Sequence, residues 1–212
     1  MFRIANDARF WDRAARKYEA SPIADLAGYE RSLERTRDYL KSGDTVVEFG
    51  CGTGTTALKL APSVGRIVAT DISSEMIAIA REKAEAEGRT NVTFEVAALD
   101  AAPWPDGTFD VALSFNVLHL VAAREESLRR IHRVLKPGGL FVTKTPCIKE
   151  MNPFLRVAVP VMQMFGKAPY VAFFSGDDLE REIAAAGFEI VERARHASRG
   201  KDARPFLVAR KQ

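Results

Sequence analysis

The stretch Val46-Val-Glu-Phe-Gly-Cys-Gly-Thr-Gly54 decides the fold class, because it joins a short β-rich run to three glycines at alternate positions. Residues 45–49 predict a buried strand that ends in this glycine-rich turn. Glycine lets a backbone approach a ligand closely, where any Cβ would collide. The helix expected after the turn adds free N–H groups and partial positive charge at its N-terminus. The arrangement is typical of a nucleotide-binding site.

The spacing of the glycines narrows the class of ligand. The dinucleotide fingerprint is G-x-G-x-x-G, whereas Gly54 comes one residue early and a threonine occupies the next position. An acidic residue, Glu48, stands two positions before the first glycine. The pattern therefore disfavours a nicotinamide-dependent oxidoreductase.

The rest of the chain alternates short β-rich runs with helical stretches, which is the signature of a parallel sheet covered on both faces. We predict a doubly wound, Rossmann-like α/β fold with a mostly parallel seven-stranded sheet and an antiparallel edge hairpin. Strands are expected at residues 45–49, 66–70, 92–96, 109–115, 140–145, 188–195 and 206–209. Helices are expected at residues 57–61, 73–87, 125–135 and 177–186, with two more between residues 7 and 40.

We expect a single domain, because no segment is long enough to fold independently beside the sheet. Its parts are a helical cap (1–43), a cofactor-binding core (44–146), an apolar insertion (147–176) and the segment that completes the sheet (177–212).

Composition excludes several classes of protein. The chain has 212 residues, of which 47% are hydrophobic and 28% charged, so it has globular composition. Cys51 and Cys147 are too few for a disulfide framework and lack zinc-site spacing, so we expect no metal. The net charge of +3 is not concentrated in a basic run, and we expect no nucleic-acid partner. Residues 154–174 are apolar but interrupted by charges and prolines, so we expect no membrane insertion and a cytoplasmic protein.

Several motifs in order resemble the class I S-adenosylmethionine-dependent methyltransferases, and more narrowly the small branch that includes ubiquinone and menaquinone methyltransferases. The acidic residue followed by G-x-G-x-G matches Glu48 and the glycine turn. The acidic residue that ends the second strand matches Asp71, followed by Ile72-Ser-Ser-Glu-Met76. Residues 102–110, 116–120 and 133–139 also resemble family segments. The resemblance is close over residues 44–145 and looser outside them.

The resemblance implies S-adenosylmethionine as the cofactor. It places Glu48 near the ammonium group at the methionine end, and it places Ile72 and Met76 against the adenine, with core packing as the less favoured alternative for Met76. A carboxylate at Asp71 can accept both ribose hydroxyls. The family's adenine-contacting aspartate falls at Ala98, which leaves the backbone N–H of Leu99 to reach the ring. The candidate cofactor-binding residues are Tyr18, Glu48, Gly50, Cys51, Gly52, Gly54, Asp71, Ile72, Met76, Ala98, Leu99 and Asn116.

Methyl transfer from a sulfonium is an in-line displacement, so proximity and alignment dominate and a base is needed only for a protonated acceptor. His119 is the candidate catalytic residue, because it follows the fourth strand at the edge where open α/β sheets bind ligands. A structural role and acceptor binding remain open for it. His132 is expected on the surface, and His196 has no argument for a site. Trp11 and Tyr18 are seven residues apart and can share one helix face; in the family such helices often close over the cofactor.

The insertion at residues 147–176 is unusually apolar for a crossover, and three interpretations are open: a wall over an acceptor pocket, a patch on a membrane surface, or a dimer contact. The first favours a small lipophilic or aromatic acceptor, and predicts that changing Phe154 and Met162 to serine raises the acceptor KM without altering cofactor affinity. We expect a monomer or homodimer. The alternatives are a non-catalytic S-adenosylmethionine-binding protein and a methyltransferase acting on a phospholipid headgroup or another membrane-associated acceptor.

Overall fold

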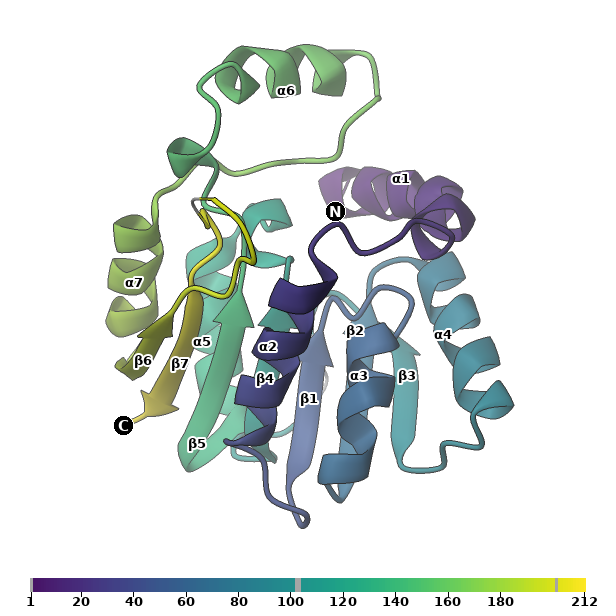
Figure 1. The fold of residues 1–212 in the computed structure, drawn as a ribbon, viewed down its shortest axis with the longest axis vertical. Coiled ribbons are helices and arrows are strands. Elements are labelled where there is room, and N and C mark those ends of the chain that lie inside the picture. Colours follow the sequence, from purple (N-terminus) through teal and green to yellow (C-terminus); the bar gives the residue numbers. More distant parts are fainter. Residues whose placement is uncertain (1, 102–103, 201) are drawn as a thin grey trace.

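A computed structural model describes residues 2–101, 104–200 and 202–212; for residues 2–4 and 100 it describes the backbone only. Within these ranges, seven strands form one sheet in the order β3-β2-β1-β4-β5-β7-β6 (Figure 1). The first five strands in this order pair in parallel, and β7 lies antiparallel between β5 and β6. The strands are β1 (Thr45–Phe49), β2 (Arg66–Asp71), β3 (Val92–Val96), β4 (Phe109–Phe115), β5 (Leu135–Lys144), β6 (Phe188–Ala194) and β7 (Phe206–Lys211). The predicted doubly wound sheet with its antiparallel edge is confirmed.

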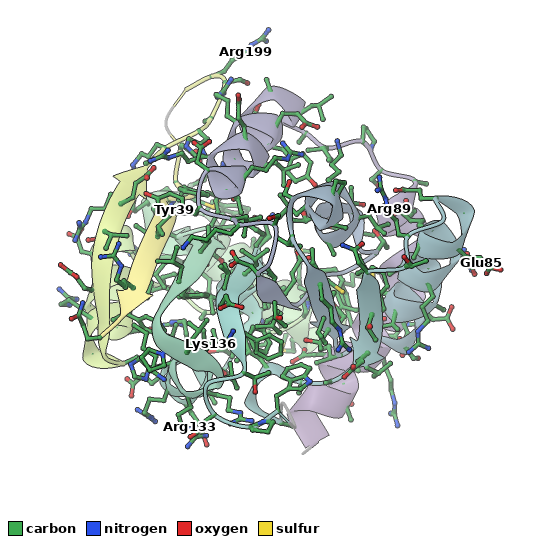
Figure 2. All side chains as sticks on the ribbon, turned by 90° about the horizontal axis from the view of Figure 1, so that it is seen from below. Tyr39, Glu85, Arg89, Arg133, Lys136 and Arg199 are labelled. Atoms are coloured by element: carbon green, nitrogen blue, oxygen red, sulfur yellow. The ribbon has the colours of Figure 1, made fainter. Side chains whose placement is uncertain are left out.

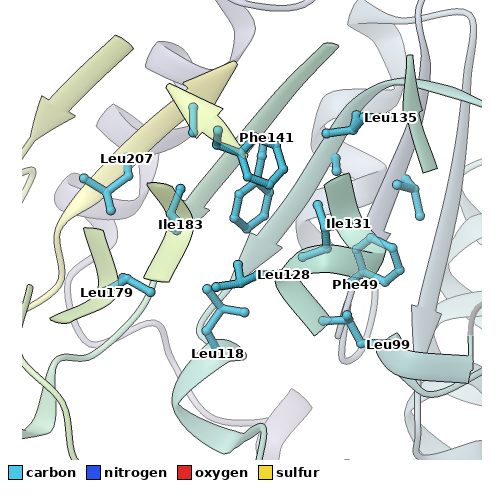
Figure 3. Packing of buried hydrophobic residues seen from close by; sticks show 14 of the residues in the cluster. Phe49, Leu99, Leu118, Leu128, Ile131, Leu135, Phe141, Leu179, Ile183 and Leu207 are labelled. Atoms are coloured by element: carbon cyan, nitrogen blue, oxygen red, sulfur yellow. The ribbon is translucent and has the colours of Figure 1, made fainter. Parts of the chain in front are cut away.

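Helices cover both faces of the sheet, because successive strand residues point to opposite sides. Val46 packs into a cluster with residues of α2, α3 and α4, whereas the next residue, Val47, packs with residues of α5 and α7. Figure 3 shows the second cluster, with Phe49 and Phe141 of the sheet facing Ile131 of α5 and Ile183 of α7. The helices are α1 (Phe2–Glu19), α2 (Leu26–Arg37), α3 (Thr55–Leu60), α4 (Ser74–Ala86), α5 (Arg124–Val134), α6 (Leu155–Met164) and α7 (Gly176–Ala185).

Local sequence accounts for the element boundaries. The Ser73 hydroxyl accepts a hydrogen bond from the Met76 N–H and caps α4, and Gly88 (φ 61°) follows the end of that helix. Ser175 and Asp178 form a capping box at the start of α7. The fifth strand is longer than predicted, since β5 begins at Leu135 and includes the Lys-Pro-Gly-Gly run, which precedes the expected strand at residues 140–145. Its pairing with β4 shifts register there, which accommodates the run as an irregularity within the strand.

The N-terminal helix α1 lies across the carboxyl ends of the strands and packs against α4 (Figure 1). The Arg16 guanidinium donates to both carboxylate oxygens of Glu82 at 2.8 and 2.9 Å. The Asp12 carboxylate accepts from the Ser73 hydroxyl at 2.7 Å, so it also lies at the N-terminus of α4. These contacts hold α1 over the edge of the sheet where the glycine loop emerges.

Charged side chains such as Glu85, Arg89 and Arg133 point outward from the fold (Figure 2). The apolar insertion behaves differently. Helix α6 stands away from the sheet (Figure 1), and none of its residues is buried. Phe154 is 69% exposed and Met162 is 44% exposed.

Candidate active site

A cavity of about 950 Å³ opens at the carboxyl edge of the sheet. Of the thirteen candidate residues, twelve line it, and they come from α1 and α4, the ends of β1 and β2, and the segments that follow β1, β2, β3 and β4. These residues are Tyr18, Glu48, Gly50, Cys51, Gly52, Asp71, Ile72, Met76, Ala98, Leu99, Asn116 and His119. The sheet topology therefore gathers residues that are up to a hundred positions apart in the sequence.

Gly54 is the exception and does not line the cavity. It has φ 76°, and a Cβ there would lie 2.7 Å from the Phe94 ring and 2.8 Å from the Ala80 Cβ. Position 54 requires glycine because its backbone is left-handed and because α4 and β3 pack closely against it. The structure gives Gly54 a packing role, and its assignment as a cofactor contact stays a prediction.

The glycine loop turns through two further left-handed residues, Gly50 (φ 65°) and Gly52 (φ 53°). A Cβ on Gly50 would lie 2.2 Å from a Val117 methyl, so this glycine allows two loops to approach. A Cβ on Gly52 would instead point into open space, with the Tyr18 ring as its nearest neighbour at 3.8 Å. Gly52 is thus the position where the backbone itself forms the cavity wall.

Asp71 ends β2 and is held by the backbone on both sides. Its Oδ2 accepts from the Gly52 N–H and its Oδ1 from the Ser73 N–H, each at 2.9 Å. Burial raises the pKa of Asp71, and these backbone N–H groups oppose that rise by favouring the carboxylate. Each oxygen keeps a second lone pair for another donor. The side chain is fixed in direction and can accept two hydroxyl groups from the cavity.

Glu48 is 2% exposed and lies in β1, immediately before the glycine loop. Burial raises its pKa to about 8, and the nearby Asp71 carboxylate adds to the rise, while the Ala57 backbone N–H opposes it. Its Oε2 is one of three buried side-chain oxygens without a hydrogen-bond partner in the described part of the chain. A buried carboxylate oxygen without a partner is costly unless a ligand satisfies it. A cationic donor entering the cavity fits this position.

The adenine side of the predicted site is apolar and backbone-rich. Met76 is 2% exposed and packs with Ala15 and Ile79, so it belongs to a small core cluster as well as to the cavity wall. Ala98 and Leu99 follow β3 on the same wall. The side chain of Asp100, a possible substitute for the aspartate missing at position 98, lies outside the described residues. Residues 102 and 103 of the resembling segment also lie outside them.

Asn116 follows β4 and has φ 58°, the left-handed region that non-glycine residues rarely occupy. Its N–H donates to the Lys144 carbonyl at 2.7 Å. Strained residues of this kind cluster at functional sites. Cys51 is buried, and burial raises the pKa of its thiol, so it lacks the thiolate character of a nucleophile.

Tyr18 and Trp11 share a face of α1, as their spacing predicts, and their rings meet edge to face with centroids 6.3 Å apart. Both line the cavity. Trp11 also packs against the cluster of Ala15, Met76 and Ile79. Tyr18 is 52% exposed and lies over Gly52, in position to cover a ligand.

His119 lies in a 3₁₀ turn after β4, and its Nδ1 is 3.0 Å from the Thr145 hydroxyl. Burial lowers its pKa to about 4, so the imidazole is neutral at physiological pH. It can accept a hydrogen bond or a proton from the cavity, although a group with so low a pKa is a weak base. His132 is not on the open surface as expected: it is partly buried, with its ring edge-on to Phe188 at 5.0 Å.

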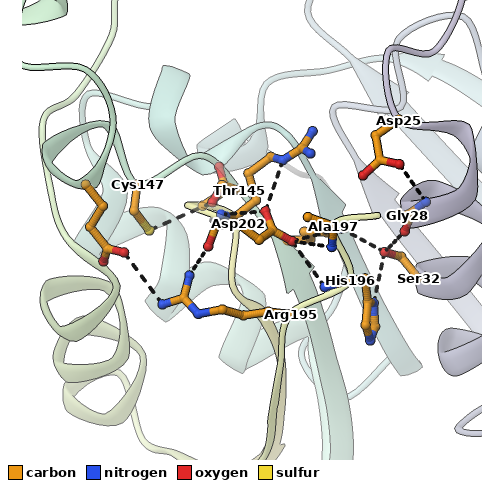
Figure 4. Close-up of polar contacts among 12 residues, drawn as sticks. Asp25, Gly28, Ser32, Thr145, Cys147, Arg195, His196, Ala197 and Asp202 are labelled. Atoms are coloured by element: carbon orange, nitrogen blue, oxygen red, sulfur yellow. Dashed lines mark hydrogen bonds and ion pairs between the residues drawn. The ribbon is translucent and has the colours of Figure 1, made fainter. Parts of the chain in front are cut away.

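The far end of the cavity was not predicted from the sequence. It is lined by Tyr29 and Ser32 of α2, by Lys144 at the end of β5 and by Arg204 before β7. The Tyr29 hydroxyl and the Thr56 hydroxyl lie 3.1 Å apart, and the Ser32 hydroxyl lies 3.0 Å from the His196 Nδ1 (Figure 4). The one signal in the sequence was Lys144, a charged residue near the end of the expected strand at residues 140–145. His196, which had no argument for a site, supports this wall through Ser32.

The insertion contributes little to this cavity. Of residues 147–176, Pro169 alone lines it, and Pro146 precedes the segment. The interpretation of Phe154 and Met162 as an acceptor wall is therefore not supported by the position of α6. Among the described helices, none is long and apolar enough to cross a membrane. No group of three or more metal-ligand side chains occurs within the described residues.

A family model described as a methyltransferase domain matches residues 40–187, about two thirds of the chain. The chain belongs to the class I S-adenosylmethionine-dependent methyltransferases. The methyltransferase is 30% identical over 153 residues to a demethylmenaquinone methyltransferase of Symbiobacterium thermophilum, covering 69% of this chain and 59% of that protein. It is 40% identical over 140 residues to a ubiquinone/menaquinone biosynthesis C-methyltransferase of an Enterobacter species, covering 62% and 55%.

A solved structure confirms the fold of the methyltransferase. An S-adenosylmethionine-dependent methyltransferase from Mesorhizobium loti superimposes with a TM-score of 0.74 at 23% identity, covering 87% of this chain and 98% of that one. In contrast, this chain spans little more than half the length of the curated relatives that it matches in sequence. S-adenosylmethionine is the cosubstrate of the family, and the buried Glu48, the oriented Asp71 and the open face of Gly52 fit it.

Proposed function

We propose that the protein transfers a methyl group from S-adenosylmethionine to a small lipophilic or aromatic acceptor. One observation carries the proposal: the unpartnered carboxylate oxygen of Glu48 and the apolar chamber beyond it belong to the same cavity. This chamber is the part of the cavity lined by the apolar residues Ile23, Leu33, Phe115, Pro146 and Pro169. Apolar walls with a few polar groups suit a compact lipophilic ligand.

Glu48 would hold the ammonium group of the cofactor, and Asp71 would accept the two ribose hydroxyls. When bound, S-adenosylmethionine supplies a methyl group on a positively charged sulfonium. The chain's own contribution is to align the acceptor with that methyl group and to exclude water from the chamber, because proximity accounts for most of the acceleration in such a displacement.

His119 would act on the acceptor. Its Nδ1 is engaged by the Thr145 hydroxyl, so Nε2 is the nitrogen available to the cavity. A neutral imidazole at this position accepts a hydrogen bond from an acceptor hydroxyl or amine and orients its lone pair. Because the pKa of His119 is about 4, its ionisation gives no activity step near pH 6.5.

The sequence relatives are named for menaquinone and ubiquinone biosynthesis, which supports a quinol as the acceptor class to examine first. The matched segment covers only part of those proteins. The test is a screen with methyl-labelled S-adenosylmethionine against lipophilic quinols, phenols, thiols and amines, measuring label in the organic phase and formation of S-adenosylhomocysteine. Transfer to at least one apolar acceptor is expected. Tight binding of S-adenosylmethionine with no transfer to any class would favour a non-catalytic binding protein.

A further inference from the structure

Lys144 is a buried cation on the wall of the cavity, and the mechanism above does not use it. It is the last residue of β5 and its side chain is 9% exposed. In the sheet order, β4 separates β5 from β1, so Lys144 ends a strand about 10 Å from the strand that carries Glu48. Lys144 therefore lies beyond the predicted cofactor groups, on the acceptor side.

The ammonium group of Lys144 has more donors than the structure satisfies. Its Nζ donates to the Ser32 hydroxyl at 3.0 Å. The Asp202 Oδ2 lies 3.8 Å away, which is too far for a hydrogen bond. An ammonium has three N–H groups, and no other hydrogen bond from this one occurs within the described residues. Buried charges are costly unless they are paired and hydrogen-bonded, so this cation has capacity for a ligand.

The carboxylates nearby are already occupied by other donors. Asp202 accepts from the N–H groups of His196 and Ala197 at Oδ2, and from the N–H of Arg204 at Oδ1. Asp25 accepts from the N–H groups of Gly28 and Ser198 and from the Ser198 hydroxyl. Figure 4 shows Asp202 and Asp25 turned to these backbone partners. They balance charge at this end but leave the donors of Lys144 open to the cavity.

A second cation lies on the same wall. Arg204 lines the cavity, and its Nε is 3.4 Å from Asp202 Oδ1. A guanidinium carries five N–H groups, so most of its donors also remain for a ligand. Burial lowers the pKa of Lys144 from its ordinary value, and Asp202 opposes this shift. An anionic oxygen placed between the two cations would favour the charged form of Lys144 further.

We propose that Lys144, assisted by Arg204, binds an acidic oxygen of the methyl acceptor, such as a carboxylate or a phenolate. The proposal rests on the proposed function and narrows it: the acceptor has an apolar body and one anionic oxygen, held at the far end of the chamber. Lys144 then acts as a specificity-determining residue that fixes which end of the acceptor faces the cofactor.

The test compares two probes of one shape, 2-naphthoate and the neutral 2-naphthamide, titrated into the full chain with and without saturating S-adenosylhomocysteine. The variants are Lys144→Met, the charge-preserving Lys144→Arg, and the control Lys149→Met. Lys149 pairs with Asp178 on the surface and does not line this cavity. We expect 2-naphthoate to bind at least tenfold more tightly than the amide, because hydrogen bonds to charged groups are the strong ones.

The preference should fall below threefold in Lys144→Met and remain in the other two variants. Equal affinity of the two probes for the unmodified chain would overturn the proposal without any variant. The proposal can therefore be tested even if the Lys144→Met protein does not fold. Binding of neither probe, or a preference unchanged in a folded Lys144→Met protein, would also overturn it. If S-adenosylhomocysteine binds while the probes show no preference, this inference fails and the proposed function stands. If S-adenosylhomocysteine does not bind, the proposed function fails.

Discussion

The two ends of the cavity are built in different ways. The glycine-loop end comes from a few residues that are close in sequence: Glu48, the loop that follows it, and Asp71 at the end of the next strand. The Lys144 end combines α2, the end of β5 and the loop before β7, which are more than fifty residues apart. The first end is fixed by the backbone and suits one cofactor. The second depends on side chains and can differ with the acceptor.

Changing Gly52 to valine should give the largest effect at the glycine-loop end. A side chain there would fill the cavity beside Tyr18, so we expect affinity for S-adenosylhomocysteine to fall at least ~100-fold in a titration, since a β-branched residue also resists positive φ. Gly88→Val is the matched control, because Gly88 has a similar φ of 61° with open space around it. Equal losses in both variants would mean that backbone strain, and not occupation of the cavity, causes the effect.

Replacing Asp71 by alanine should weaken S-adenosylhomocysteine binding by ~1.5–3 kcal/mol, the range for hydrogen bonds to a charged group. Asp110→Ala is the control, because the Asp110 carboxylate also accepts from a backbone N–H, that of Thr45, and does not line the cavity. The control should alter thermal stability and leave affinity unchanged. Unchanged affinity in Asp71→Ala, measured by calorimetry, would contradict the ribose assignment.

Glu48 should make cofactor binding depend on pH. Its pKa is about 8 in the free protein, so binding of a cationic amine requires loss of a proton below that pH, and affinity should rise ~10-fold or more from pH 6 to 7.5. Conversely, the free protein should lose stability as pH rises from about 4.5 to 8, because the folded state holds a proton that the unfolded state releases. Glu48→Gln should remove both dependences. A parallel pH profile in wild type and variant would show that Glu48 does not face the ammonium group.

Changing Phe154 and Met162 together to serine should give the smallest effect. Phe154, immediately before α6, and Met162 within it are exposed and neither lines the cavity, so cofactor affinity should change less than ~twofold and stability by less than ~0.5 kcal/mol. The sequence-based expectation of a higher acceptor KM should fail as well. A rise in that KM would show that α6 reaches the acceptor in solution, whereas a shift from dimer to monomer on a sizing column would assign it to a contact between copies.

The contrast between the two ends also explains what could be predicted from the sequence. Strand periodicity and capping residues such as Ser73 determine helices and strands from local sequence, and the glycine spacing identifies the loop expected to bind the cofactor. The fold and the glycine-loop end of the cavity could therefore be predicted from the sequence. For Gly54, the sequence does not distinguish a glycine required by a ligand from a glycine required by packing, because the packing of Phe94 against it is visible only in the structure. Lys144 and Arg204 were missed because only the pairing of β5 with β7 brings them together. The position of α6 was missed because apolar composition does not say against what a segment packs.

The most direct measurement for the central claim is a calorimetric titration of the unmodified chain with S-adenosylmethionine, followed by the same titration with NAD. The glycine spacing, the oriented Asp71 and the unpartnered Glu48 predict one S-adenosylmethionine per chain, displaced by S-adenosylhomocysteine, and no competition by NAD. Absence of S-adenosylmethionine binding at millimolar concentration, or its displacement by NAD, would contradict the account.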